Sequence, residues 1–146
     1  MRIEQSITIA APREEVWRYV SQPERYSEFM VGFRWEPCPG EAVNGKGARF
    51  QIYIDVISVD LGGTVEVIEY DPPHELAWTS ITGIDHRGRW ILRNCGPDET
   101  KVTMRLGYQV PGGILALVSS RVGAPGISRN IRRSLSNLKS VVEGAP

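Results

Sequence analysis

Two side chains of this sequence have both the chemistry and the position that proton transfer requires. His86 alternates with Gly88 and Trp90 in the stretch DHRGRWILRNC, so a strand there would turn all three toward one apolar face. Tyr108 lies near the end of a second alternating stretch, KVTMRLGYQV. An inward imidazole with a phenol nearby can act as a general acid/base pair, because histidine exchanges protons near neutral pH. The alternative interpretation is a strand-end histidine whose partner is solvent or the backbone.

Other catalytic and metal-binding patterns are not found in the sequence. It has no GxSxG elbow, no glycine-rich phosphate loop and no pair of carboxylates at a recognisable spacing. Cys38 and Cys95 are isolated, with no CxxC pattern and no histidine at metal-ligand spacing. The sequence therefore predicts no metal site, no cofactor and two reduced cysteines that do not pair. His74 follows two prolines in a turn and is expected to be exposed.

Charge and hydropathy exclude several classes of partner. The 17 basic and 17 acidic residues cancel, which argues against a nucleic-acid partner, since a broad nucleic-acid surface needs net positive charge. No apolar run approaches the roughly 20 residues that span a bilayer. The first residues, MRIEQSITIA, lack the apolar core of a signal peptide, so a cytoplasmic protein is expected. The oligomeric state is left open between a monomer and a homodimer.

The elements that position these side chains follow from the hydrophobic pattern. Alternation predicts a strand over residues 2–9, and two short helices follow within APREEVWRYV and SQPERYSEF, the second with Ser21 as N-cap and Glu24 completing a capping box. Six more strands are expected within residues 33–38, 48–57, 64–70, 75–81, 85–95 and 101–110. Short turns between consecutive strands predict an antiparallel meander.

The C-terminal segment predicts one long amphipathic helix. Its apolar stripe recurs at three- and four-residue spacing: Ile127, Ile131, Leu135, Leu138 and Val142. Arg129, Arg132 and Arg133 lie off the stripe, as a solvated face or as contacts for an anionic partner or lipid head groups. The predicted fold is α+β: a seven-stranded curved antiparallel sheet around the long helix, with two short helices after the first strand. One helix rarely fills such a concave sheet, so a cavity is expected.

The inward positions of these elements predict an aromatic-lined ligand cavity, and the alternative is that the same side chains simply fill the core. The candidate lining residues are Phe29, Met30, Trp35, Phe50, Ile52, Ile54, Trp78, Trp90, Met104, Tyr108, Ile131 and Leu135. The apolar stretch at residues 112–122 is a candidate lid through Ile114, Leu115 and Val118, with Gly123, Pro125 and Gly126 breaking or kinking the chain after it. Core packing, a dimer contact and membrane docking are the alternatives for that stretch.

Several stretches resemble the START-like helix-grip superfamily, specifically its polyketide cyclase/dehydrase and lipid-transport group. They are ITIAAPREEVWRYVSQPERYSEFM, VEVIEYDPPHELAW, GRWILRN, ETKVTMRLGY and the C-terminal helix, which together cover nearly the whole chain. The sequence departs from the group at Phe29-Met30, where tryptophan is usual, and at the Gly-Ala-Pro-Gly interruption of residues 123–126. The resemblance implies a helix-grip fold and one START-like ligand-binding domain over residues 1–146. Members of the superfamily include aromatase/cyclases, carriers of lipids or hormones, coenzyme Q binders and activators of chaperone ATPases.

The expected function is binding of a hydrophobic small molecule, such as a lipid, a polyketide or another aromatic or isoprenoid-like compound, between the sheet and the C-terminal helix. One alternative is an enzyme of the polyketide cyclase/dehydrase type, in which His86 or Tyr108 moves protons for an aldol cyclisation or dehydration. A protein-interaction module is the second alternative, and it would need an exposed apolar patch.

Overall fold

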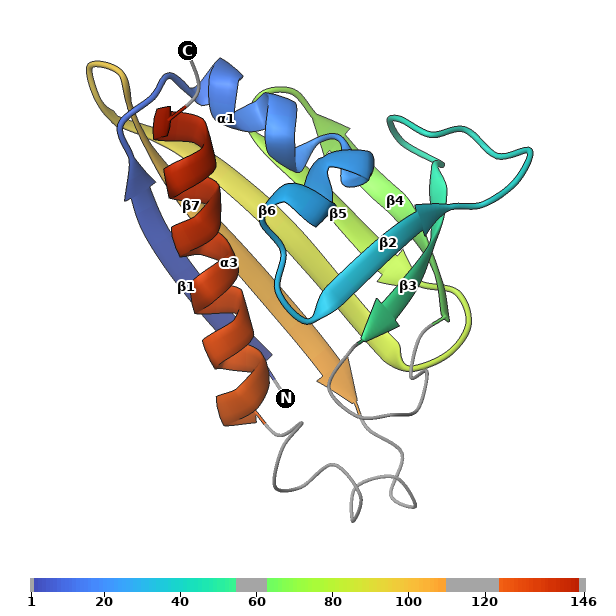
Figure 1. Ribbon diagram of the computed structural model, residues 1–146. Helices are drawn as coiled ribbons and strands as arrows, with labels where there is room; N and C mark the ends of the chain where they lie inside the picture. Colours follow the sequence, from blue (N-terminus) through green and yellow to red (C-terminus); the bar gives the residue numbers. More distant parts are fainter. Residues whose placement is uncertain (1, 55–62, 110–123, 145–146) are drawn as a thin grey trace.

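The computed structural model describes residues 2–54, 63–109 and 124–144, and in these residues seven strands form one antiparallel sheet (Figure 1). The strand order is β1-β7-β6-β5-β4-β3-β2. The strands are β1 (Arg2–Ile9), β2 (Phe33–Pro37), β3 (Arg49–Ile54), β4 (Gly63–Asp71), β5 (Glu75–Ser80), β6 (Asp85–Gly96) and β7 (Glu99–Gln109). Strands β2 to β7 are consecutive neighbours and β1 closes the sheet against β7, which confirms the predicted seven-stranded meander.

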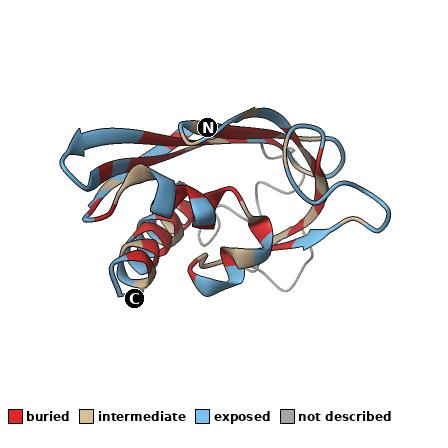
Figure 2. Cartoon of the chain, turned by 90° about the horizontal axis from the view of Figure 1, so that it is seen from above, coloured by how far each residue is buried: buried red, intermediate tan, exposed pale blue. Residues whose placement is uncertain are grey.

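The helices all cover one face of this sheet. They are α1 (Arg13–Val20), the 3-10 helix η1 (Pro23–Glu28) and the long α3 (Ala124–Gly144). Figure 2 shows the curved sheet as one layer and the helices as a second, with the buried side of α3 turned toward the sheet. In Figure 1, α3 runs along the β1–β7 side, while α1 lies over β6 and η1 packs beside β2. The predicted α+β architecture is confirmed.

The long helix α3 forms because its apolar residues recur on one side. The five residues of the predicted stripe, from Ile127 to Val142, are all buried. Pro125 lies in the first turn, where a missing backbone N–H costs no helical hydrogen bond. The helix therefore begins inside the Ala-Pro-Gly sequence, and within the described residues these positions start α3 rather than interrupt it.

The predicted capping box at Ser21 is wrong. Ser21 instead ends α1, and its N–H donates to the carbonyl of Trp17 at 2.9 Å. Pro23 disfavours a helical conformation at the residue before it, and Gln22 accordingly has φ −119° and ψ 93°. Gln22 is therefore the N-cap of η1, with no capping bond from its side chain.

Strand register determines which side chains meet on the inner face of the sheet. Across β5, β6 and β7, Leu76, Trp90 and Met104 form one row. Trp78, Gly88 and Leu106 form the next. His86 and Tyr108 are paired in the third, nearest the end of β7.

No helix among the described residues is both long and apolar enough to cross a membrane.

Candidate functional site

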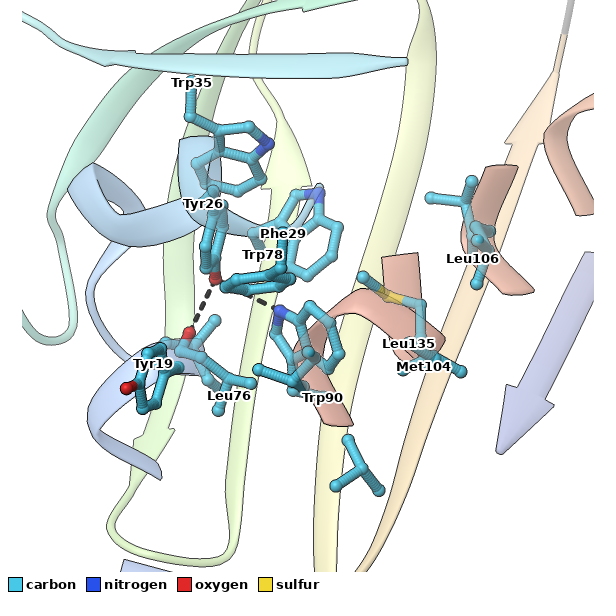
Figure 3. Close-up of a cluster of buried hydrophobic side chains, with 14 of the residues drawn as sticks. Tyr19, Tyr26, Phe29, Trp35, Leu76, Trp78, Trp90, Met104, Leu106 and Leu135 are labelled. Atoms are coloured by element: carbon cyan, nitrogen blue, oxygen red, sulfur yellow. Dashed lines mark hydrogen bonds between the residues drawn. The ribbon is translucent and has the colours of Figure 1, made fainter. Parts of the chain in front are cut away.

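Six buried aromatic side chains from four strands and the η1 region form a continuous cluster inside the sheet (Figure 3). Trp35 is its centre, since its ring contacts Tyr26 and Trp78 at 5.2 Å between centroids and Phe50 at 5.6 Å. The Trp35–Tyr26 and Trp35–Trp78 pairs are edge-to-face, with interplanar angles of 79° and 85°, which is a favoured aromatic geometry. Phe29 extends the cluster to Trp90 at 6.2 Å.

Tyr26 ties η1 to the sheet through its buried hydroxyl. The hydroxyl donates to the carbonyl oxygen of Val20 at 2.6 Å and accepts a hydrogen bond from Trp90 Nε1 at 3.1 Å, drawn as dashed lines in Figure 3. Burial raises the pKa of the Tyr26 phenol far above its usual value. Tyr26 therefore stays neutral and serves as a structural donor and acceptor.

Gly88 determines where the indole of Trp78 lies. The two residues are opposite each other in the β5–β6 register, and a Cβ at position 88 would overlap Cζ2, Cη2 and Cε2 of the indole. The ring thus occupies the space that a side chain would need. Trp78 is 3% exposed, and its Nε1 has no hydrogen-bond partner in the described part of the chain. Among the described residues this buried N–H donor is therefore left unpaired.

His86 presents an unpaired acceptor on the same face. Its Nδ1 lies 2.9 Å from the carbonyl oxygen of Ile84, which can only accept, so Nδ1 carries the hydrogen. Burial lowers the pKa of the imidazole, against smaller opposing effects of the Ile84 carbonyl and Asp85, and favours the neutral ring. The side chain is 7% exposed, and its Nε2 is buried with no partner among residues 2–54, 63–109 and 124–144.

Tyr108 lies opposite His86 in the β6–β7 register and is also buried. Burial raises the pKa of its phenol, so the hydroxyl remains protonated near neutral pH. The structure therefore brings the two predicted proton-transfer candidates to neighbouring strands on one face.

Most of the other predicted cavity residues are buried in the same core. Phe50, Ile52, Met104, Ile131 and Leu135 are buried, whereas Met30 is only partly buried against the core. The side chain of Ile54 and the predicted lid residues Ile114, Leu115 and Val118 lie outside the described residues.

Sequence reasoning missed Tyr26, Leu106 and Gly88. Leu106 was available from the alternation of β7, where it shares a face with Met104 and Tyr108. Gly88 could have been suspected, because a glycine inside a strand often marks a close approach by another group. Tyr26 had no periodic signal, but a buried indole such as that of Trp90 needs an acceptor.

Side chains of α3 fix the loop between η1 and β2 along the edge of the aromatic cluster. Ser134 Oγ accepts a hydrogen bond from Val31 N–H at 2.8 Å, and Asn137 Nδ2 donates to the carbonyl of Phe29 at 3.2 Å. Gly32 has φ +81°, and a Cβ there would overlap the side-chain amide of Asn130. The segment that carries Phe29 is thus held against α3.

Potential ligands of a metal ion are dispersed in the structure. Within the described ranges no group of three or more His, Cys, Asp or Glu side chains could hold a metal. Cys38 is half-buried and Cys95 is exposed, and both are free thiols. His74 is exposed and lies beside Asp71, as expected from its turn.

Comparison with known proteins places this geometry in a family. The uncharacterized protein Rv0088 of Mycobacterium tuberculosis is 26% identical over 116 residues, which are 77% of this chain and 50% of that protein. The chain thus spans about half the length of this curated relative.

Solved structures share the fold at low sequence identity. The Zhui aromatase/cyclase from Streptomyces sp. R1128 has a TM-score of 0.77 at 18% identity, over 98% of this chain and 93% of that chain. TTHA0849 from Thermus thermophilus has a TM-score of 0.75 at 18% identity, over 99% and 98%. The fold is therefore the helix-grip fold. Residues 1–143 match the family described as polyketide cyclase/dehydrase and lipid transport, and the chain belongs to that family.

Proposed function

We propose that the chain binds a hydrophobic small molecule between the inner face of the sheet and α3. The proposal covers lipids, polyketides and other aromatic or isoprenoid-like compounds. The lining would come from the aromatic cluster on one side and from Met104, Leu106 and Leu135 on the other, which Figure 3 shows facing the same interior. The family described as polyketide cyclase/dehydrase and lipid transport is consistent with such a ligand.

One observation carries this proposal: Trp78 Nε1 and His86 Nε2 are buried without partners in the described part of the chain. A core that only packs against itself nearly always pairs its buried polar atoms, because an unpaired one costs about 1–3 kcal/mol. Two such atoms on one apolar face therefore favour a site whose occupant supplies the missing partners. The surrounding aromatic surface would supply the affinity, at roughly 25 cal/mol for each Å² of apolar area removed from water.

Native mass spectrometry of protein purified without detergent, followed by solvent extraction, tests this proposal. An apolar compound retained at a fixed stoichiometry is the expected result. The control is a Leu106→Trp variant, whose larger side chain would fill the interior that Leu106 faces. Retention of the compound by this variant, while it stays folded by circular dichroism, would argue for adsorption elsewhere.

The second candidate function is an enzyme of the cyclase/dehydrase type, favoured by the unpaired Nε2 of a neutral His86 next to Tyr108 in register. In an aldol cyclisation, His86 Nε2 would take a proton from the carbon beside one carbonyl. That carbon would then bond to a second carbonyl carbon, whose oxygen would receive a proton from the Tyr108 hydroxyl. Solvent would return the proton from His86 to Tyr108.

Mutations of His86 and Tyr108 distinguish the enzyme function from the carrier function. If the chain is an enzyme, His86→Ala and Tyr108→Phe should abolish turnover of the extracted compound while changing its affinity less than about 10-fold. If the chain is a carrier, wild-type protein incubated with the compound should return it unchanged in mass. The cytoplasmic location expected from the sequence remains a prediction.

A further inference from the structure

The two unpaired ring nitrogens of the inner face differ in hydrogen-bonding character. Trp78 Nε1 can only donate, because an indole N–H has no acceptor lone pair. His86 Nε2 can only accept, since the hydrogen of the neutral ring is on Nδ1, bonded to Ile84. The other buried unpaired atoms in the described residues are Nε of Arg13 and of Arg105, and both arginines are partly exposed.

Trp78 and His86 start from neighbouring rows of the same face of the sheet. The Cε2 atom of Trp78, which is bonded to Nε1, is among the indole atoms over Gly88. Gly88 and His86 are two residues apart on β6 and face the same side, so they are separated by roughly 6.6 Å at about 3.3 Å per residue. A hydroxyl oxygen that hydrogen-bonds both nitrogens at about 2.9 Å each, with a roughly tetrahedral angle between the bonds, needs them about 4.7 Å apart, which two long side chains on neighbouring rows can reach.

We infer that Trp78 and His86 together form a recognition site for one hydroxyl group on an otherwise apolar ligand. The hydroxyl oxygen accepts from Trp78 Nε1–H and the hydroxyl hydrogen is donated to His86 Nε2. This inference rests on the proposed binding function and narrows its ligand class to alcohols, phenols and enols. A ketone or an ether can accept the hydrogen bond from Trp78 but has no hydrogen to donate to His86. A hydrocarbon can form neither hydrogen bond.

The test uses three probes of one shape: 2-naphthol, 2-methoxynaphthalene and naphthalene. The first donates and accepts, the second only accepts, and the third does neither. We expect equilibrium dialysis to show 2-naphthol binding about 10- to 100-fold more tightly than naphthalene, with the ether between them or as weak as naphthalene. The preference should be measured at pH 7.5, where both 2-naphthol and His86 are neutral.

Two variants separate the roles of the nitrogens. Trp78→Phe keeps an aromatic ring without the donor, and His86→Leu keeps apolar volume without the acceptor. Each should reduce the preference for 2-naphthol by about 5-fold or more while naphthalene still binds. The matched controls are Trp17→Phe, on α1, and His74→Gln, in an exposed turn, and both should keep the wild-type preference.

Nuclear magnetic resonance of the wild-type protein gives a readout that does not depend on the folding of any variant. With 2-naphthol, hydrogen bonding should move the Nε1–H proton of Trp78 downfield and the unprotonated Nε2 of His86 upfield, whereas bound naphthalene should cause only ring-current shifts. Equal affinity for all three probes would overturn the inference but leave the proposed function standing, since a bound water would then serve the two nitrogens. Binding of no probe up to its solubility limit would overturn both.

Discussion

The indole of Trp90 on β6 donates its Nε1–H to the hydroxyl of Tyr26 in η1, although the two residues are 64 positions apart in the sequence. The same hydroxyl donates to Val20 at the end of α1, so one oxygen joins the sheet to both short helices. Tyr26 also packs edge-to-face against Trp35. The Tyr26 phenol therefore joins both short helices to the sheet at the end of the fold that carries the aromatic cluster.

Replacing this phenol should destabilise the fold. Tyr26→Phe keeps the ring but leaves the indole N–H of Trp90 and the carbonyl of Val20 without their partner in a buried position. We expect the free energy of unfolding, measured by urea titration, to fall by about 1–3 kcal/mol. Tyr53→Phe is the matched control, because Tyr53 is only half-buried on the outer side of β3 and its ring stacks with Arg34. An equal loss in both variants would contradict the role assigned to the Tyr26 hydroxyl.

A side chain at Gly88 should disturb both stability and binding. Gly88→Ala would place a methyl group inside the indole of Trp78, which cannot retreat freely because Trp35 packs against it at 5.2 Å. We expect a loss of about 1–3 kcal/mol in the free energy of unfolding, from overpacking. The same substitution in a Trp78→Phe background should cost less, since the smaller ring leaves room.

Gly96→Ala on the same strand is the control for this prediction. A Cβ at position 96 would lie 3.5 Å from Oε2 of Glu99, which is ordinary contact, so stability should change little. If Gly88→Ala is as mild as Gly96→Ala, then Trp78 has another position available, and its indole is less constrained than the structure indicates.

Much of the fold could be predicted because its signals are periodic. The alternation in β6 and β7 is enough to place Trp90 and Met104 on the inner face of the sheet. The apolar stripe of α3 lies on one side of the helix, so it determines which side packs against the sheet. Consecutive strands with short turns leave a meander as the simplest pairing. Trp78 is buried for the same reason, whereas its role in lining a ligand cavity stays a prediction.

The contacts of the candidate site could not be predicted in the same way. Tyr26 lies in a 3-10 helix of six residues, too short to show a hydrophobic period, and its partner Trp90 is on a distant strand. The capping pattern at Ser21 does not form because Pro23 disfavours a helical conformation at Gln22, which would have to be the first helical residue after a Ser21 cap. The unpaired nitrogens of Trp78 and His86 depend on ring orientation, which strand alternation does not determine.

The pH dependence of stability should carry a contribution from His86. Burial lowers the pKa of this imidazole in the folded state, so below the ordinary histidine value of about 6.5 the unfolded chain binds a proton that the folded chain resists. The contribution of His86 is therefore fully present above that value and is lost as the pH falls toward the folded pKa. Urea titrations between pH 7.5 and 5 should show this decline in wild type and a weaker one in His86→Gln.

His74→Gln is the matched control for the pH prediction, since His74 is the other histidine of the chain and is exposed. It should leave the decline with pH unchanged. With two histidines, a proton resonance titration of the imidazoles resolves them directly. A folded-state pKa for His86 above 6.5 would reverse the sign of its contribution and contradict the neutral, accepting Nε2 on which the hydroxyl site depends.

The attachment of the Phe29 loop to α3 should be visible in hydrogen exchange. Ser134 Oγ accepts from Val31 N–H at 2.8 Å and donates to the carbonyl of Asn130 at 2.7 Å, so Ser134→Ala leaves the Val31 amide without its partner. We expect that amide to exchange about 2- to 10-fold faster, because a net hydrogen bond contributes about 0.5–1.5 kcal/mol. Ser136→Ala, on the exposed side of α3, should leave the rate unchanged. Faster exchange along the whole sheet in Ser134→Ala would instead indicate global destabilisation, and an unchanged Val31 rate would mean that other contacts hold this loop closed.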